Sequence, residues 1–153
     1  MDIKKYAVES DKIFLADESP EFAKLEGEVP EDERVWVKVR QATQADNIRL
    51  ADINTQRERK YSGDQLTGNV NSVSLVYNSN PLRRQATQVY LTVVEIGNLT
   101  DGDKPVFDVA PLKKMPEATF LAKWGSLRTE LANAIHKACL KVNPDWDDLL
   151  LGE

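Results

Sequence analysis

The sequence predicts an α+β fold in which two to three main helices pack on a short antiparallel sheet or hairpin. Two observations lead to this fold class. Residues 34–40 alternate between valine and charged or aromatic side chains, as a strand with one buried face does. Residues 81–96 and 127–142 place apolar side chains three and four positions apart, as packed helices do. A mostly α fold with one hairpin is the alternative.

The strand over residues 34–40 is expected to bury Val35, Val37 and Val39 on one face. Trp36 falls on the other face, where its ring can lie against the stems of charged neighbours. One buried and one wet face are typical of a small antiparallel sheet. Residues 106–109 are expected to pair with this strand. Residues 12–16 form a short apolar run that indicates another strand. The acidic stretch after it is predicted as loop, in which Phe22 and Leu25 allow one helical turn.

A helix is expected directly after the strand. Thr43 stands at the position of an N-cap, and Asp46 three residues later completes a pattern like a capping box. The helix is expected to end near residues 61–64, where Gly63 is suited to a left-handed cap. The apolar stripe expected to face the core runs through Ile48, Ala51 and Thr55, and Leu50 and Ile53 widen it.

Two longer helices follow. Pro81 opens the first, since proline at the first helical position costs no hydrogen bond. This helix is expected to run without a break to Ile96 and to end at Gly97. Ser126 is expected to cap the last helix, which ends at Asn143–Pro144.

Composition indicates a soluble globular protein of a reducing compartment. The 153 residues are 41% hydrophobic and 29% charged, and the formal net charge of -5 argues against nucleic-acid binding over the whole surface. One cysteine and one histidine argue against a disulfide framework or a zinc site. No apolar run approaches the roughly 20 residues of a membrane helix, and residues 1–5 lack the apolar core of a signal peptide. We therefore expect no cofactor, no metal, no nucleic acid and no membrane.

The charge is unevenly distributed and divides the chain into three parts. Residues 1–33 form an acidic N-terminal segment, partly strand and partly loop, with eleven acidic and four basic residues. Residues 34–144 form a mildly basic, globular α+β domain. Residues 145–153 form an acidic-hydrophobic C-terminal tail. The acidic ends either act as solubilising or interaction tails or fold back onto the basic middle.

No catalytic residue is predicted. His136, the only imidazole, lies beside the apolar stripe of the last helix and is expected to be structural, because a general base needs a placed partner. Cys139 is expected to be a small core side chain. The glycines form no phosphate-binding loop. An enzyme is therefore not expected, and an unrecognised carboxylate site would be needed to make it one.

The C-terminal tail contains the candidate partner-binding residues: Trp146, Leu149, Leu150 and Leu151. Burying one such side chain fully is worth roughly 1.5–3 kcal/mol, so leaving all four in water is unfavourable. Trp146 is expected to pack against the last helix just after Pro144. For the three leucines, contact with a partner or a neighbouring subunit is favoured.

Several short motifs lie at intervals along the chain. The first is a strand followed by an Arg-Gln-Ala-Thr helix start, which here spans Trp36–Asp46. The others are Val89–Thr92, Ile96–Leu99, Ala134–His136 and Val142–Trp146. Together these motifs resemble the tail assembly chaperones of tailed bacteriophages with long non-contractile tails. The resemblance covers about residues 34–146, and none of its motifs is a catalytic signature.

The resemblance implies a non-enzymatic viral protein that acts in the host cytoplasm during virion morphogenesis. Such chaperones coat the tape-measure protein and recruit tail-tube subunits, and many have a longer form made by translational frameshift. Helix-in-groove contact is the expected mode of protein–protein interaction. Trp146 and Leu149–Leu151 are then the expected contacts, and self-association is a further option. The alternative is a structural protein of the virion, such as a neck, tail-terminator or capsid-associated subunit.

Overall fold

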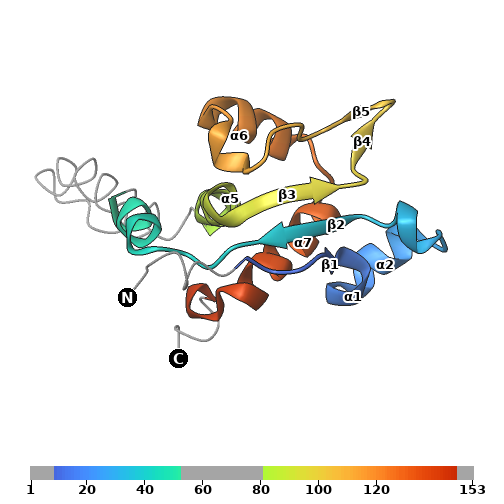
Figure 1. Ribbon diagram of the computed structural model, residues 1–153, viewed down its shortest axis with the longest axis horizontal. Helices are drawn as coiled ribbons and strands as arrows, with labels where there is room; N and C mark the ends of the chain where they lie inside the picture. The colour runs from blue at the N-terminus through green and yellow to red at the C-terminus, as the bar shows by residue number, and fades with distance from the viewer. Residues whose placement is uncertain (1–8, 53–80, 148–153) are drawn as a thin grey trace, which may run out of the picture.

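The computed structural model describes residues 9–52 and 81–147, which form the predicted α+β fold (Figure 1). A further helical stretch without a label covers residues 44–52. The labelled strands and helices, in chain order, are β1 (Ile13–Phe14), α1 (Leu15–Glu18), α2 (Pro20–Glu26), η2 (Glu31–Glu33), β2 (Trp36–Val39), α5 (Pro81–Thr92), β3 (Val93–Gly97), β4 (Thr100–Asp101), β5 (Lys104–Pro105), η3 (Leu112–Lys114), α6 (Glu117–Gly125), α7 (Thr129–Val142) and η4 (Pro144–Trp146).

The main sheet is antiparallel, with the strand order β1-β2-β3. Val37 lies opposite Ile13 on one side and Ile96 on the other. Val35, Val37 and Val39 are buried, which confirms the predicted inner face of this strand. That face packs against α7, which lies behind the sheet in Figure 1. Trp36 is on the other face, where its ring fills the space left by Gly97.

The prediction of one helix from Pro81 to Ile96 is wrong in its last third. α5 ends at Thr92, and the chain continues directly into β3 at Val93. The apolar run suits either structure by its spacing, but its β-branched residues favour a strand. The main-chain carbonyl of Thr92 accepts a hydrogen bond of 2.9 Å from the amide of Arg40, so the helix end is tied to the neighbouring strand.

The expected pairing of residues 106–109 with β2 is also wrong. β1 and β3 already occupy the two edges of β2, so no edge is left for a further strand. Residues 104–105 form β5 instead, which pairs with β4 in a separate hairpin. Phe107 follows this hairpin and is buried edge-on against Phe120, with 5.8 Å between the ring centroids.

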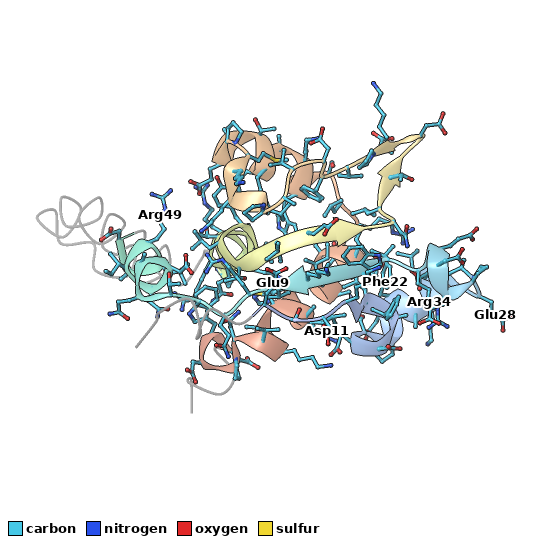
Figure 2. The ribbon with its side chains drawn as sticks, in the orientation of Figure 1. Glu9, Asp11, Phe22, Glu28, Arg34 and Arg49 are labelled. Atoms are coloured by element: carbon cyan, nitrogen blue, oxygen red, sulfur yellow. The ribbon has the colours of Figure 1, made fainter. Side chains whose placement is uncertain are left out.

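The acidic stretch predicted as loop contains two short helices, α1 and α2. The Ser19 hydroxyl accepts a hydrogen bond of 3.2 Å from the Phe22 amide, and Pro20 occupies the first turn, which is a regular N-terminal cap. The strand before them is shorter than expected, because β1 spans only Ile13–Phe14. Glu28, beyond α2, lies at one extremity of the described fold in Figure 2.

The described part of the N-terminal segment folds back onto the last helix. Leu15 is fully buried and Phe22 is 4% exposed, and α1 and α2 both contact α7. Lys141 Nζ lies 2.6 Å from Glu18 Oε1, and Lys137 Nζ lies 3.9 Å from Glu21 Oε2. Of the two alternatives for the acidic N-terminal segment, residues 9–33 therefore adopt the folded-back one.

The helix after β2 begins as predicted. The Thr43 amide donates to Asp46 Oδ2 over 2.8 Å, and the Asp46 amide donates to the Thr43 hydroxyl over 3.4 Å, so the capping box is confirmed. Its predicted apolar stripe is wrong where it is described, because Ile48 is 54% exposed, whereas Leu50, which was expected only to widen the stripe, is buried. Two residues apart on a helix, these side chains point to opposite faces. Ala51 is exposed, and Ile53, Thr55 and the expected end at 61–64 lie outside the described residues.

The last helix starts three residues later than its predicted cap. Ser126 instead follows α6, and its hydroxyl donates to the Lys123 carbonyl over 2.7 Å. α7 begins at Thr129 and ends at Val142. The apolar stripe predicted over residues 127–142 is buried in its middle, at Leu131, Ala134, Ile135 and Ala138, whereas Leu127 and Val142 at its ends are half-buried. None of the helices within residues 9–52 and 81–147 combines the length and apolar character needed to cross a bilayer.

Candidate functional site

Arg40, Asp46 and the Leu91 carbonyl form a cluster of largely buried polar contacts, here called the Arg40 junction. It joins the end of β2 to the helix over residues 44–52 and to α5. Arg40 Nη1 lies 2.8 Å from Asp46 Oδ2, and Nη2 donates to Asp46 Oδ1 over 3.1 Å. Arg40 Nη2 also donates to the carbonyl of Leu91. Two parallel bonds between a guanidinium and a carboxylate fix both side chains in one geometry.

Asp46 is the charged centre of this junction. Its side chain is 7% exposed. Burial raises the pKa of Asp46, but hydrogen bonds from Arg40 and Thr43 outweigh the burial and hold the pKa of this carboxyl below its usual value. The carboxylate is therefore ionised and paired in the folded protein at neutral pH.

Asn143 ties the end of α7 into the same junction. Its side-chain oxygen accepts from the Ala42 amide over 2.7 Å, and its side-chain nitrogen donates to the Arg40 carbonyl over 3.1 Å. Asn143 is 8% exposed, so both backbone groups are satisfied away from water. The residue that ends the last helix thus also closes the loop after β2.

Trp146 follows in η4 and is 6% exposed. Its indole nitrogen donates to Asn47 Oδ1 over 2.8 Å, which reaches the helix over residues 44–52. η4 packs on α7, as expected for Trp146 from its place after Pro144. Contact of Trp146 with a partner stays a prediction. Leu149, Leu150 and Leu151 lie outside the described residues.

An open groove of about 560 Å³ runs between α5 and α7 and is here called the α5/α7 groove. The first turn of α2 borders it, and η4 and the residue after it form part of its wall. Its lining includes Pro81, Arg84, Gln85, Asn133, Lys137 and Leu140, together with Trp146 and Asp147.

Hydrogen bonds between side chains of α5 and α7 connect the two helices at two successive turns along the groove. Gln85 Nε2 donates to Asn133 Oδ1 over 3.3 Å. One turn further along α5, Gln88 Oε1 lies 2.7 Å from His136 Nε2, and Gln88 Nε2 donates to the Trp146 carbonyl over 3.3 Å. Because Gln88 Oε1 is an acceptor, His136 Nε2 carries the hydrogen in this arrangement. His136 therefore supports the groove wall, as the expected structural histidine.

Two features describe the chemistry available in the described residues: the grouping of possible metal ligands and the state of the Cys139 thiol. No three His, Cys, Asp or Glu side chains among residues 9–52 and 81–147 are grouped to hold a metal ion. Cys139 is fully buried, and burial raises the pKa of its thiol to about 11. The thiol lies 3.1 Å from the Thr92 hydroxyl, and its raised pKa keeps it protonated at neutral pH.

The structure brings together motifs that are far apart in the sequence. Four of the five segments that carry the family resemblance meet at the Arg40 junction and the adjoining groove wall. They supply Arg40 and Asp46 from the first motif, Leu91 and Thr92 from the second, His136 from the fourth, and Asn143 and Trp146 from the fifth. The remaining motif contributes Ile96, which pairs with Val37 in the sheet.

Sequence reasoning missed Gln88 and Asn143 as organising residues. Gln88 is 2% exposed, but Arg83, Arg84, Gln85 and Thr87 shortly before it are polar as well, so the local sequence gives no signal that Gln88 is buried. Asn143 was interpreted only as part of a helix stop. A polar side chain at a helix end has unpaired backbone groups close by, so its amide is well placed to bond them.

A scan against protein-family models found no match to this chain, and searches of curated proteins and of solved structures found none either.

Proposed function

We propose that this chain is a non-enzymatic tail assembly chaperone of a tailed bacteriophage. In this proposal it binds the tape-measure protein in the host cytoplasm and helps to recruit tail-tube subunits. Trp146 and Leu149–Leu151 form its contact region. Trp146 acts as a buried anchor, and the leucines that follow it reach the partner.

The observation that carries the proposal is the convergence of the resembling motifs. Segments separated by about a hundred residues are joined by direct bonds, such as those of Asn143 to the backbone around Arg40. Such convergence favours a resemblance of one structural unit over a set of unrelated short matches. It also places the start of the tail, through Trp146, on the same hydrogen-bonded frame.

The open groove beside Trp146 supports a binding role for this end of the fold. A groove between two helices is a common receptor for an amphipathic helix. Tape-measure proteins are long and helical in the family that the sequence resembles. The buried thiol and the structural histidine fit a binding protein better than an enzyme.

Co-expression with the tape-measure protein of the same phage tests the proposal. The full chain should keep the tape-measure protein soluble and be captured with it. A chain with Leu149→Ser, Leu150→Ser and Leu151→Ser should lose most of this capture. Leu82→Ser is the matched control, because Leu82 is a leucine already 73% exposed on α5 and its loss should leave capture unchanged.

If the full chain neither solubilises nor captures the tape-measure protein, the chaperone function is refuted. Equal capture by the wild type and the triple-serine chain would reject the tail as the contact region.

A further inference from the structure

The α5/α7 groove and the C-terminal tail meet at one place in the fold. Trp146 and Asp147 both line the groove, and Asp147 is the last residue before the tail leaves the described structure. Leu149 follows Asp147 by two positions. We propose that Leu149–Leu151 of the same chain occupy the α5/α7 groove when no partner is bound.

The length of the tail after Asp147 matches the length of the groove along α5. An extended chain spans at most about 3.3–3.6 Å per residue, so Leu151 reaches about 13–14 Å from Asp147. Along α5, the groove runs from the level of Gln88 to Pro81, which is about 10 Å at the rise of an α-helix. Three consecutive leucines beginning two residues after Asp147 therefore span the groove.

The chemistry of the groove agrees as well. Leu140 and the Trp146 ring offer apolar surface at the end where the tail enters, and Pro81 offers it at the other end. Arg84 on α5 and Lys137 on α7 are the basic residues of the lining, and Glu21, Glu130 and Asp147 are its acidic ones. The apolar surface, rather than the charge of the lining, therefore favours the leucines as the occupant.

Acidic residues also border the groove, but positive charges lie beside them. The Glu130 carboxylate lies 3.3 Å from Arg128 Nε, and the Glu21 carboxylate lies 3.9 Å from Lys137 Nζ. These contacts reduce the repulsion that a tail carrying Asp148 would otherwise meet.

Covalent attachment favours the chain's own leucines over any other occupant. A segment that begins two residues from its binding site is present there at a high effective concentration, whereas a partner segment must arrive from solution. One consequence rests on the proposed function: a partner that binds the leucines must first draw them out of the groove. The tail then acts as an internal competitor that lowers the affinity of the free chaperone.

A spin label on the tail tests the docking without any partner, so the result is independent of the proposed function. Gly152→Cys places a thiol next to the leucines, and a nitroxide is attached there. The native Cys139 is fully buried and stays unlabelled in the folded chain. The NMR signals of the side-chain amides of Gln85 and Asn133 should broaden strongly, and those of Asn98, next to the sheet, serve as the reference.

The matched control carries the same label together with Leu149→Ser, Leu150→Ser and Leu151→Ser. Docking driven by the leucines predicts a several-fold loss of the broadening at Gln85 and Asn133 in this chain. Unbroadened signals in the first chain, or equal broadening in both, would overturn the proposal. Mixing labelled chains with unlabelled, isotope-enriched ones checks the occupant, and broadening in the mixture would assign the groove to a second copy instead.

Discussion

The Arg40 junction and the α5/α7 groove share the Trp146 end of the molecule but use polar side chains differently. At the junction, Arg40, Asp46 and Asn143 are largely buried and bond to each other or to backbone groups. In the groove, Gln85 and Asn133 form a bond at an exposed position, beside open space. A buried polar cluster holds segments in one arrangement, whereas an exposed polar wall is free to accept another molecule or segment. The junction thus holds distant segments together, and the groove beside it is the surface that we propose as a binding site.

Asp46→Ala should break the junction and have the largest effect on stability. It leaves the largely buried guanidinium of Arg40 without its carboxylate. Breaking a fully buried pair typically costs about 3–5 kcal/mol, which is an upper bound here because the Arg40 side chain is 17% exposed. Urea unfolding measures the change in the free energy of unfolding. Glu130→Ala removes one partner of an exposed pair and is the control, which should leave the urea midpoint unchanged. Similar small changes in both chains would mean that the junction does not hold the fold together.

Gln88→Ala and Gln85→Ala sharpen the comparison within one helix. Gln88 is buried, and its removal breaks its hydrogen bonds to the Trp146 carbonyl and to His136 Nε2, which should lower the free energy of unfolding by about 1–3 kcal/mol. Gln85 makes only an exposed bond to Asn133, so its removal should change stability by no more than about 0.5 kcal/mol. Thermal unfolding of the two variants side by side gives the difference. If Gln85→Ala lowers the unfolding temperature as much as Gln88→Ala, the exposed bond between Gln85 and Asn133 stabilises the fold as strongly as the buried bonds of Gln88 do.

The pH dependence of the Asp46 contribution should give the smallest effect. The folded-state pKa of Asp46 lies below its usual value of 3.8. Its stabilising contribution is therefore fully present above pH values near 3.8 and is lost as the pH falls through the lower folded-state pKa. The stability gap between the wild type and Asp46→Ala should be constant near neutral pH and narrow below pH 3.8. A gap that narrows already between pH 7 and pH 5 would mean that Asp46 is not ionised and paired as described.

Local patterns in the sequence predicted the parts of the fold that depend on local physics. The alternation at Val35, Val37 and Val39 and the capping box of Thr43 and Asp46 both involve neighbouring residues, and both are confirmed. The helix-to-strand change at Thr92–Val93 was missed, because it depends on pairing with β2 rather than on spacing. Ser19 followed by Pro20 is a recognisable start of a helix, but the acids and prolines around it led to the prediction of a loop.

The candidate site was less accessible from the sequence than the fold. Its frame depends on contacts such as Asn143 to Ala42, which join residues about a hundred positions apart. No periodicity within one element reports such a contact. Trp146 was identified because a large apolar side chain among acids needs a place to pack, and it is buried. The groove beside it required the positions of α5 and α7, which only the folded chain provides.

The most direct test of the proposed function compares two samples from one infection. This chain is immunoprecipitated from infected cells before lysis, and mature particles are purified from the lysate. Quantitative mass spectrometry then measures this chain and the tape-measure protein in both samples. The account predicts that the tape-measure protein is captured with this chain from the cells and that this chain is absent from the particles. A fixed, stoichiometric amount of this chain in mature particles, without capture of the tape-measure protein, would contradict the account and identify a structural subunit of the virion.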